Sequence, residues 1–190
     1  VEQLDWSFPD WVMVPVGAAC LFAGIWKGFR DFHEIDLIDS LPKLAAIQST
    51  GCAPLVRAFK QGKEPFQIEP WSRPDTIASG LADVLPWDGD AALVALKKGG
   101  TAEAVSNEEI LKAQKLLAST EGIFAEPSAV TSLAGLIRLL DFGTVRKDEK
   151  VVVLITGTGL KDPEAITKTS KETPTIEPTI YEFERLVKAM

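Results

Sequence analysis

The chain has 190 residues, of which 46% are hydrophobic, enough for one globular domain with a buried core. A net charge of −7 and scattered lysines argue against a nucleic-acid surface. The apolar stretches are far shorter than the roughly 20 residues that cross a bilayer, and no signal peptide is evident. Two cysteines form neither a disulfide framework nor a metal cluster. We therefore expect a cytoplasmic protein that has no metal site and binds neither nucleic acid nor membranes.

The chain begins with Val1 rather than with Met, and residues 1–6 look like the last turn of a helix. We interpret the chain as a fragment of a longer protein or as the product of a shortened gene.

The stretch from Pro9 to Phe29 predicts a strand, a tight turn and a helix. Trp11–Val16 is a short, partly β-branched apolar run typical of a buried strand. Small residues at 17–20 then form a turn, and the apolar period changes to that of a helix. The apolar helical positions are Phe22, Ile25, Trp26, Phe29 and Phe32. A strand, a small-residue turn and a helix can hold an anion on free backbone N–H groups, although most such connections bind nothing.

Short strands and helices alternate through the rest of the chain. We predict strands at 44–48, 101–105 and 151–155, helices at 54–60, 76–83, 88–98 and 128–142, and a further helix after Ser106 that carries Ile110, Ala113, Leu116 and Leu117. Ser106 and Glu109 have the spacing of a capping box at the start of one helix. Residues 151–155 (VVVLI) are apolar throughout, as in a strand covered on both faces.

This alternation predicts an α/β fold, a three-layer αβα sandwich with a mostly parallel sheet. We assign residues 1–165 to this domain. Residues 166–190 form a polar tail with a short C-terminal helix over 177–190.

Four side chains are candidates for chemistry. Thr156 directly follows the strand at 151–155, where ligands of open α/β sheets bind, although a plain glycine-rich turn is equally compatible. Glu126 is a lone carboxylate before Pro127, a position that is more often structural. His33 is the single histidine, and a solvated side chain is the simpler interpretation. Cys20 lies at a helix start, where the dipole lowers a thiol pKa, but a small buried residue is the simpler interpretation.

The segment VPVGAACLFAGIWKGF resembles the phosphate cup of the fold-type II pyridoxal-phosphate (PLP) enzymes, especially the threonine synthases. The resemblance implies that the backbone of Gly17, Ala18, Ala19, Cys20 and Leu21 surrounds the cofactor phosphate. The sequence departs from the family pattern, because alanines and a cysteine stand where glycines or asparagines are expected. Each added side chain narrows the cup, and an Ala with positive φ is strained.

Two further segments carry the resemblance. TGTGLKDP, from Thr156, is similar to the segment after the last core strand of threonine synthases, which implies that Thr156 hydrogen-bonds the pyridine nitrogen. GIFAEPSAV is similar to a segment near the cofactor and implies a secondary role for Glu126. The TIASG sequence at 76–80 is closer to threonine dehydratases and serine racemases, so the substrate stays open.

The resemblance covers most of 9–163 and corresponds to the C-terminal half of a complete enzyme. The Schiff-base lysine of the family lies in an upstream segment, and Ser170-Lys171 has the wrong surroundings, so we assign no catalytic residue. The resemblance implies a threonine-synthase-like lyase of amino-acid biosynthesis, which converts O-phosphohomoserine to threonine when intact. The alternatives are a threonine dehydratase-like or β-replacement enzyme, or a catalytically inactive truncated homologue that acts as a structural or interaction domain.

For partners, the resemblance implies a small amino-acid substrate in the intact enzyme. We also expect a half-domain to expose the apolar sheet face that the missing half would cover. This predicts either a homo-oligomer or association with a complementing N-terminal half.

Overall fold

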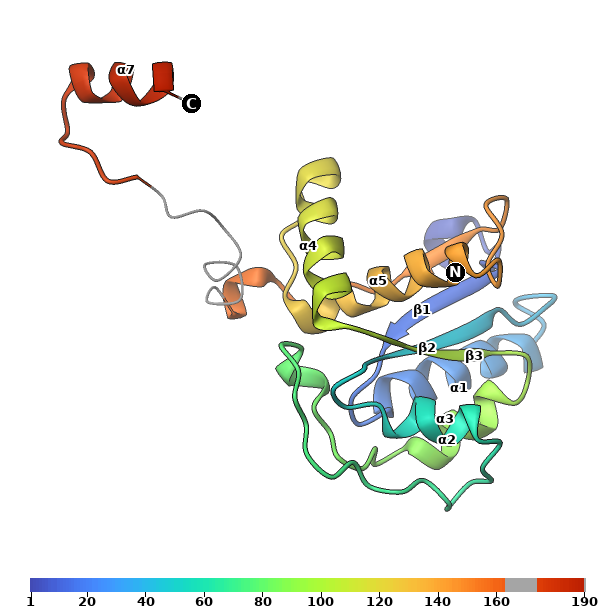
Figure 1. Cartoon of the computed structure of the whole chain (residues 1–190). Coiled ribbons are helices and arrows are strands. Elements are labelled where there is room, and N and C mark those ends of the chain that lie inside the picture. Colours follow the sequence, from blue (N-terminus) through green and yellow to red (C-terminus); the bar gives the residue numbers. More distant parts are fainter. Residues whose placement is uncertain (163–173, 190) are drawn as a thin grey trace.

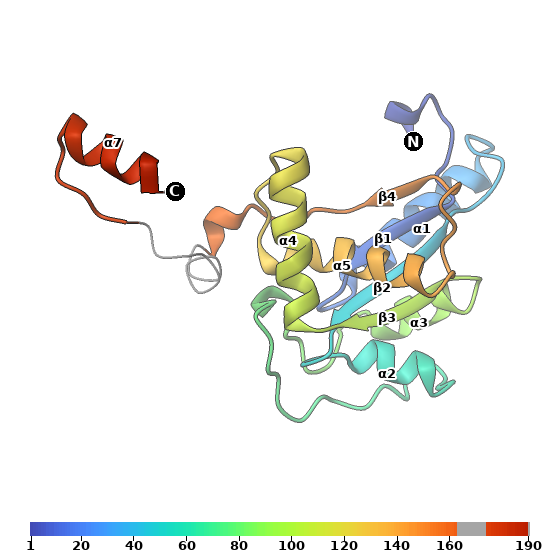
Figure 2. The same cartoon turned by 45° about the horizontal axis from the view of Figure 1, so that its top comes forward.

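The computed structural model describes residues 1–162 and 174–189, and its centre is a four-stranded sheet with the order β3-β2-β1-β4. All three neighbouring pairs are parallel. The strands are β1 (Trp11–Pro15), β2 (Lys43–Ser49), β3 (Thr101–Val105) and β4 (Val151–Val153). All five residues of β1 are buried, because it is a central strand covered on both faces. Figure 2 shows β4 beside β1, at the sheet edge opposite β3.

Helices cover both faces of the sheet (Figure 1). Alternate strand residues such as Val12 and Leu44 pack with α1, α2 and α3, whereas Met13 and Ile47 pack with α4 and α5. This arrangement confirms the predicted three-layer sandwich. The expectation of an exposed apolar sheet face is wrong, because α1–α3 bury one face of the sheet and α4–α5 bury the other.

The helix bounds follow local sequence signals. The α-helices are α1 (Cys20–Glu34), α2 (Pro54–Lys60), α3 (Gly89–Leu96), α4 (Asn107–Glu121), α5 (Pro127–Asp141) and α7 (Ile180–Ala189). Short 3₁₀ turns are η1 (Glu2–Leu4), η2 (Ser79–Leu81) and η3 (Gly159–Lys161). The capping box at Ser106 and Glu109 is formed in full, as the sequence predicts. Pro127 begins α5 at a position where its missing N–H costs nothing.

The predicted helix at 76–83 is wrong, because only η2 forms there. The hydroxyl of Thr76 accepts a hydrogen bond from the amide of Ala78 (3.0 Å), and Asn107 Oδ1 accepts from the amide of Ile77 (3.2 Å). These side-chain acceptors replace the carbonyls that a helix would supply. The segment therefore passes over the carboxyl ends of the strands without forming an α-helix.

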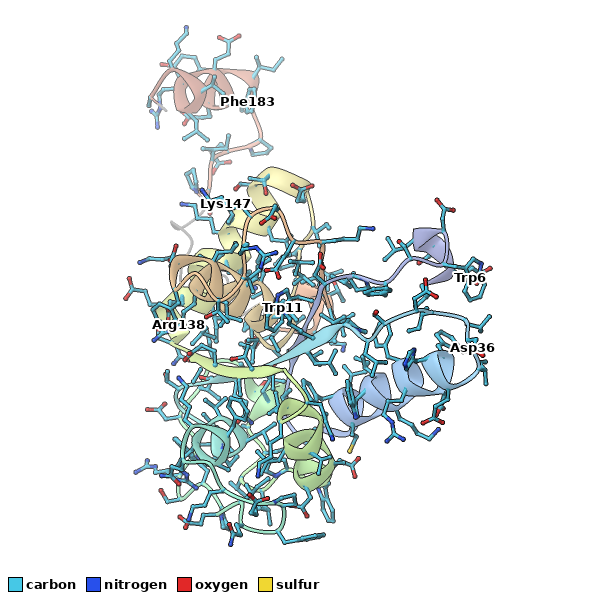
Figure 3. The ribbon with its side chains drawn as sticks, turned by 90° about the vertical axis from the view of Figure 1, so that its right-hand side faces the viewer. Trp6, Trp11, Asp36, Arg138, Lys147 and Phe183 are labelled. Atoms are coloured by element: carbon cyan, nitrogen blue, oxygen red, sulfur yellow. The ribbon has the colours of Figure 1, made fainter. Side chains whose placement is uncertain are left out.

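The two ends of the chain lie outside the sandwich. Near the N-terminus, the ring of Trp6 contacts the ring of Phe32 at the end of α1. Phe32 is nevertheless 36% exposed, although its place on the apolar face of the helix predicts burial. Near the C-terminus, α7 lies apart from the sheet, and its labelled Phe183 is exposed (Figures 1 and 3). The helix confirms the expected C-terminal helix, whereas the expectation for 163–173 falls outside the described residues. No helix within 1–162 or 174–189 has the length and hydropathy to cross a membrane.

Candidate functional site

The turn after β1 presents free backbone donors at the start of a long helix. Ala19 is the N-cap of the 15-residue α1 and has a left-handed backbone (φ 68°), which costs an alanine about 1 kcal/mol. Its side chain has no hydrogen-bonding group to cap the helix. Within the described part of the chain, the amides of Gly17, Ala18, Ala19 and Leu21 donate no hydrogen bond, and the amide of Cys20 interacts only with its own thiol. Such amides, together with the helix dipole, favour an anion.

Residues 80–88, here called the crossing segment, pack directly against this turn. The amide of Asp88 donates to the carbonyl of Ala18 at 3.0 Å. A Cβ at Gly17 would stand 2.5 Å from Oδ2 of Asp83 and 3.0 Å from the carbonyl oxygen of Gly80. Gly17 is thus required because the crossing segment comes so close. The segment places two carboxylates, those of Asp83 and Asp88, beside the free amides.

The two cysteine thiols respond to these carboxylates. A hydrogen bond with Asp88, desolvation and the negative charges of Asp88 and Asp83 raise the pKa of Cys20 above its usual 9.0. Burial and then Asp83 raise the pKa of Cys52. The expectation that the helix dipole lowers the Cys20 pKa is therefore wrong, and so is its predicted burial, since the side chain is exposed. Nearby negative charge outweighs the dipole at this turn.

Thr156 lies at the carboxyl end of the strands, the same end as the turn. β4 pairs with β1 in the register Met13↔Val153, and the amide of Leu154 still donates to the carbonyl of Met13 at 3.1 Å. Because the two strands are parallel neighbours, Thr156 leaves β4 beside the residues that leave β1 for the turn. The Thr156 side chain is exposed at this edge, so its hydroxyl is accessible to a ligand.

Glu126 packs against the segment that follows β4. Its amide donates to the carbonyl of Gly157 at 3.1 Å, and a Cβ at Gly157 would stand 2.1 Å from its Oε1. Its carboxylate also lies 3.8 Å from Nζ of Lys161. Glu126 thus anchors the backbone next to Thr156, and the structure brings these two predicted residues together.

A depression opens beside the turn along the crossing segment. It has a volume of about 490 Å³, and its exposed walls include Phe66 and Trp87. Asp83 and Asp90 supply carboxylates to its lining. Asp83 and Asp88 are the residues that sequence reasoning missed as site residues. Their signal was their place in and just after the segment 76–83, whose TIASG sequence resembles that of threonine dehydratases and serine racemases.

His33 lies away from this edge, near the end of α1. Its Nδ1 is 3.0 Å from the carbonyl oxygen of Ile38, so the ring has a local structural partner. Across the described residues, no group of three or more His, Cys, Asp and Glu side chains is arranged to hold a metal ion.

The backbone of this turn favours binding of a cofactor phosphate, whereas the neighbouring side chains oppose it. The free amides and the helix dipole suit a phosphate. The carboxylates of Asp83 and Asp88 repel one, and the side chains of Ala18, Ala19 and Cys20 stand where the resemblance leads us to expect glycines or asparagines. The backbone of the turn therefore fits a phosphate dianion, and the side chains beside it weaken the binding.

Comparison with known proteins places this architecture. The chain is 45% identical over all its 190 residues to the threonine synthase of Methanocaldococcus jannaschii, and covers 46% of that protein. It is 42% identical over 180 residues to the threonine synthase of Methanosarcina acetivorans, covering 94% of this chain and 44% of the relative. The chain thus spans about half the length of the curated relatives it matches.

Solved structures show the same fold at lower identity. The fungal L-serine ammonia-lyase from Rhizomucor miehei superposes with a TM-score of 0.68 and 23% identity, covering 89% of this chain and 53% of that one. The processed form of threonine deaminase isoform 2 from Solanum lycopersicum gives a TM-score of 0.65 with 23% identity, covering 85% and 43%. The profile described as "Pyridoxal-phosphate dependent enzyme" matches residues 1–157. The chain belongs to the family of pyridoxal-phosphate dependent enzymes, as a threonine synthase-like member that is partial relative to its homologues.

Proposed function

We propose that this chain is the C-terminal half of the large domain of a threonine-synthase-like lyase. The observation that carries the proposal is the parallel pairing of β1 with β4, because it sets the turn 17–21 and Thr156 side by side. In the complete assembly, the amides of the turn would face the cofactor phosphate, and the Thr156 hydroxyl would face the ring nitrogen. The reaction we assign to that assembly is the conversion of O-phosphohomoserine to threonine.

The test is a titration of the purified chain with pyridoxal phosphate, followed by borohydride reduction and intact-mass measurement. We expect saturable binding without a covalent adduct, because the Schiff-base lysine belongs to the absent segment. Thr156→Val should change the absorption spectrum of the bound cofactor. The matched control is Thr144→Val. Thr144 is exposed and lies between α5 and β4, at the amino end of the strands. A specific lysine adduct would contradict the assignment of the lysine to another segment.

A second variant tests the turn itself. Ala18→Gly combined with Ala19→Gly removes two methyl groups and relieves the left-handed strain at Ala19. Cofactor affinity should rise. Unaltered affinity would remove the support for a phosphate site here.

Asp83 and Asp88 place carboxylates beside the free amides of the turn, where they repel a phosphate. This favours a second candidate, an inactive homologue that keeps the sheet as a structural or interaction domain. Complete absence of cofactor binding, with the fold intact by circular dichroism, would support this candidate over the first.

The partner we propose is an N-terminal half that adds to the open edge of the sheet. β4 pairs with β1 on one side, and its three residues remain half-buried instead of buried. More than half of each matched relative lies outside the match, so a complementing polypeptide is large enough to cover this edge. Sedimentation of the chain with the separately expressed N-terminal half of the Methanocaldococcus jannaschii relative tests this proposal. A homo-oligomer that excludes that half would favour self-association instead.

A further inference from the structure

We propose that the carboxylates of Asp83 and Asp88 set the anion affinity of the turn 17–21, so that the turn binds a phosphate dianion more weakly than its backbone alone would allow. The proposal rests on the proposed function only in its choice of this turn as the phosphate site. It adds two residues that determine how tightly the turn holds an anion, and it explains how a backbone suited to phosphate binds one weakly.

Asp88 is held at the turn by its own backbone. Its amide donates to the carbonyl of Ala18 at 3.0 Å, and it is the N-cap of α3, so its position is fixed from both sides. Sγ of Cys20 lies 3.8 Å from the same carbonyl, and the interaction with Asp88 is the largest cause of the raised pKa of that thiol. The carboxylate therefore sits beside the first turn of α1, where a phosphate would bind.

Asp83 is fixed in a similar way. Its carbonyl accepts a hydrogen bond from the buried Cys52 thiol at 3.4 Å, and its Oδ2 faces Gly17 across a gap too small for a methyl group. Upstream, the amide of Gly80 donates to Ser128 Oγ at 3.0 Å, and Leu81 is buried in the core. The crossing segment is thus tied to α5 and to the loop after β2, and its carboxylates do not move away cheaply.

These negative charges lack a cationic partner. Among the described residues, the ion pairs of the chain join other groups, and none includes Asp83 or Asp88. An unpaired carboxylate a few ångströms from a bound dianion costs enough, even in a solvated site, to weaken binding several-fold. The raised pKa of the Cys20 thiol agrees with this sign of the local potential.

Neutralising either residue should therefore open the turn to phosphate. Asp88→Asn keeps a good N-cap residue, and Asp83→Asn is nearly isosteric. The matched control is Asp90→Asn, which makes the same charge change on α3. Asp90 accepts a hydrogen bond from the amide of Phe66, and the charges that raise the pKa of Cys20 at the turn are those of Asp88 and Asp83.

The experiment titrates each purified variant with inorganic phosphate at constant ionic strength and follows ³¹P line broadening. We expect Asp88→Asn and Asp83→Asn to bind phosphate about five- to tenfold more tightly than the natural chain, and Asp90→Asn to match the natural chain. A second measurement is the pH dependence of Cys20 alkylation, mapped by mass spectrometry. Its midpoint should move to lower pH in Asp88→Asn and stay unchanged in Asp90→Asn.

Equal phosphate affinity in all variants would overturn the proposal, and so would an unchanged alkylation midpoint in Asp88→Asn. The probe contains no aldehyde and needs no lysine. Tighter phosphate binding in the variants, with no cofactor binding in any chain, would therefore sustain this inference while the proposed function fails. Saturable cofactor binding to the natural chain, with no gain in phosphate affinity in the variants, would support the proposed function and overturn this inference.

Discussion

Gly135 in the middle of α5 lies directly on Ile47 of β2, and a Cβ at Gly135 would stand 2.5 Å from both Cγ1 and Cδ1 of that isoleucine. The isoleucine is fully buried, with core neighbours on the same sheet face. The absence of a side chain at 135 is what lets α5 approach the sheet. Packing at this point fixes the helix that carries Glu126 at its N-terminus.

Gly135→Ala should destabilise the domain by about 1–3 kcal/mol, because the added methyl group has no space beside Ile47. Gly24→Ala on α1 is the matched control, since nothing lies within 4 Å of its new Cβ. That change should stabilise the domain by about 0.5–1 kcal/mol through helix propensity. Urea unfolding of both variants measures the difference. Equal effects of the two substitutions would contradict the packing argument.

A buried carboxylate joins β3 to α2 and α5. Glu103 is 7% exposed, and its Oε1 lies 2.7 Å from Nζ of Lys60 and 3.6 Å from Nε of Arg138, the α5 residue labelled in Figure 3. Glu103→Gln should cost about 1–2 kcal/mol, because it leaves Lys60 with a neutral partner and Arg138 with Glu109 alone, and Lys60 is half-exposed to screening water. Glu108→Gln breaks the exposed pair with Lys112 and should leave the unfolding midpoint unchanged. A Glu103 variant as stable as the control would show that the buried charge contributes nothing.

Stability should depend on pH through Glu109. Burial raises the pKa of its carboxyl, but hydrogen bonds from Ser106 and Arg138 outweigh burial, so the pKa lies below the usual 4.5. A lowered carboxyl pKa contributes stability above its unfolded value and loses it as pH falls through the folded one. Glu109→Gln keeps a residue able to complete the capping box but does not titrate. The natural chain should therefore exceed this variant at pH 7 and lose its advantage below pH 4.5, in unfolding curves at several pH values. A constant difference down to pH 3 would refute the assignment.

The C-terminal helix α7 should not contribute to domain stability. It has no buried residue, and Phe183 and Val187 on its apolar stripe are 58% and 54% exposed. Deleting residues 174–190 should shift the melting temperature by less than about 1 °C, because little apolar area leaves a packed environment. Calorimetry of the full and shortened chains measures this. A loss of several degrees would mean that the helix docks on the domain in solution.

Much of the sandwich was predictable because its signals are local. The apolar run at 151–155 predicts β4, which the structure places at Val151–Val153, and the spacing of Ser106 and Glu109 predicts the start of α4. The long helix expected over 128–142 is α5, shifted by one residue at each end. These elements follow from periodicity and capping, which depend on neighbours in the sequence.

The errors lie where distant residues decide the structure. The crossing segment has helix-compatible residues, yet Asn107 and Ser128 accept hydrogen bonds from it and from the residues just before it, and prevent a helix from forming. The potential at the turn follows from Asp83 and Asp88, which lie more than 60 residues from it along the sequence. The turn alone therefore predicts an anion site, and only the fold shows which charges stand next to it.

The pairing of β4 with β1 also determines when the domain can form during synthesis. Oδ2 of Asp10 accepts a hydrogen bond from the amide of Lys150, across a sequence separation of 140 residues. Strand β1 is translated first of the four strands, but its partner on one side, β4, is translated last. Until then β1 is an unpaired apolar edge, a state that is prone to aggregate and that slows folding in sheets with distant contacts. Residues 11–15 therefore lack their partner on one side until residue 153 has left the exit tunnel.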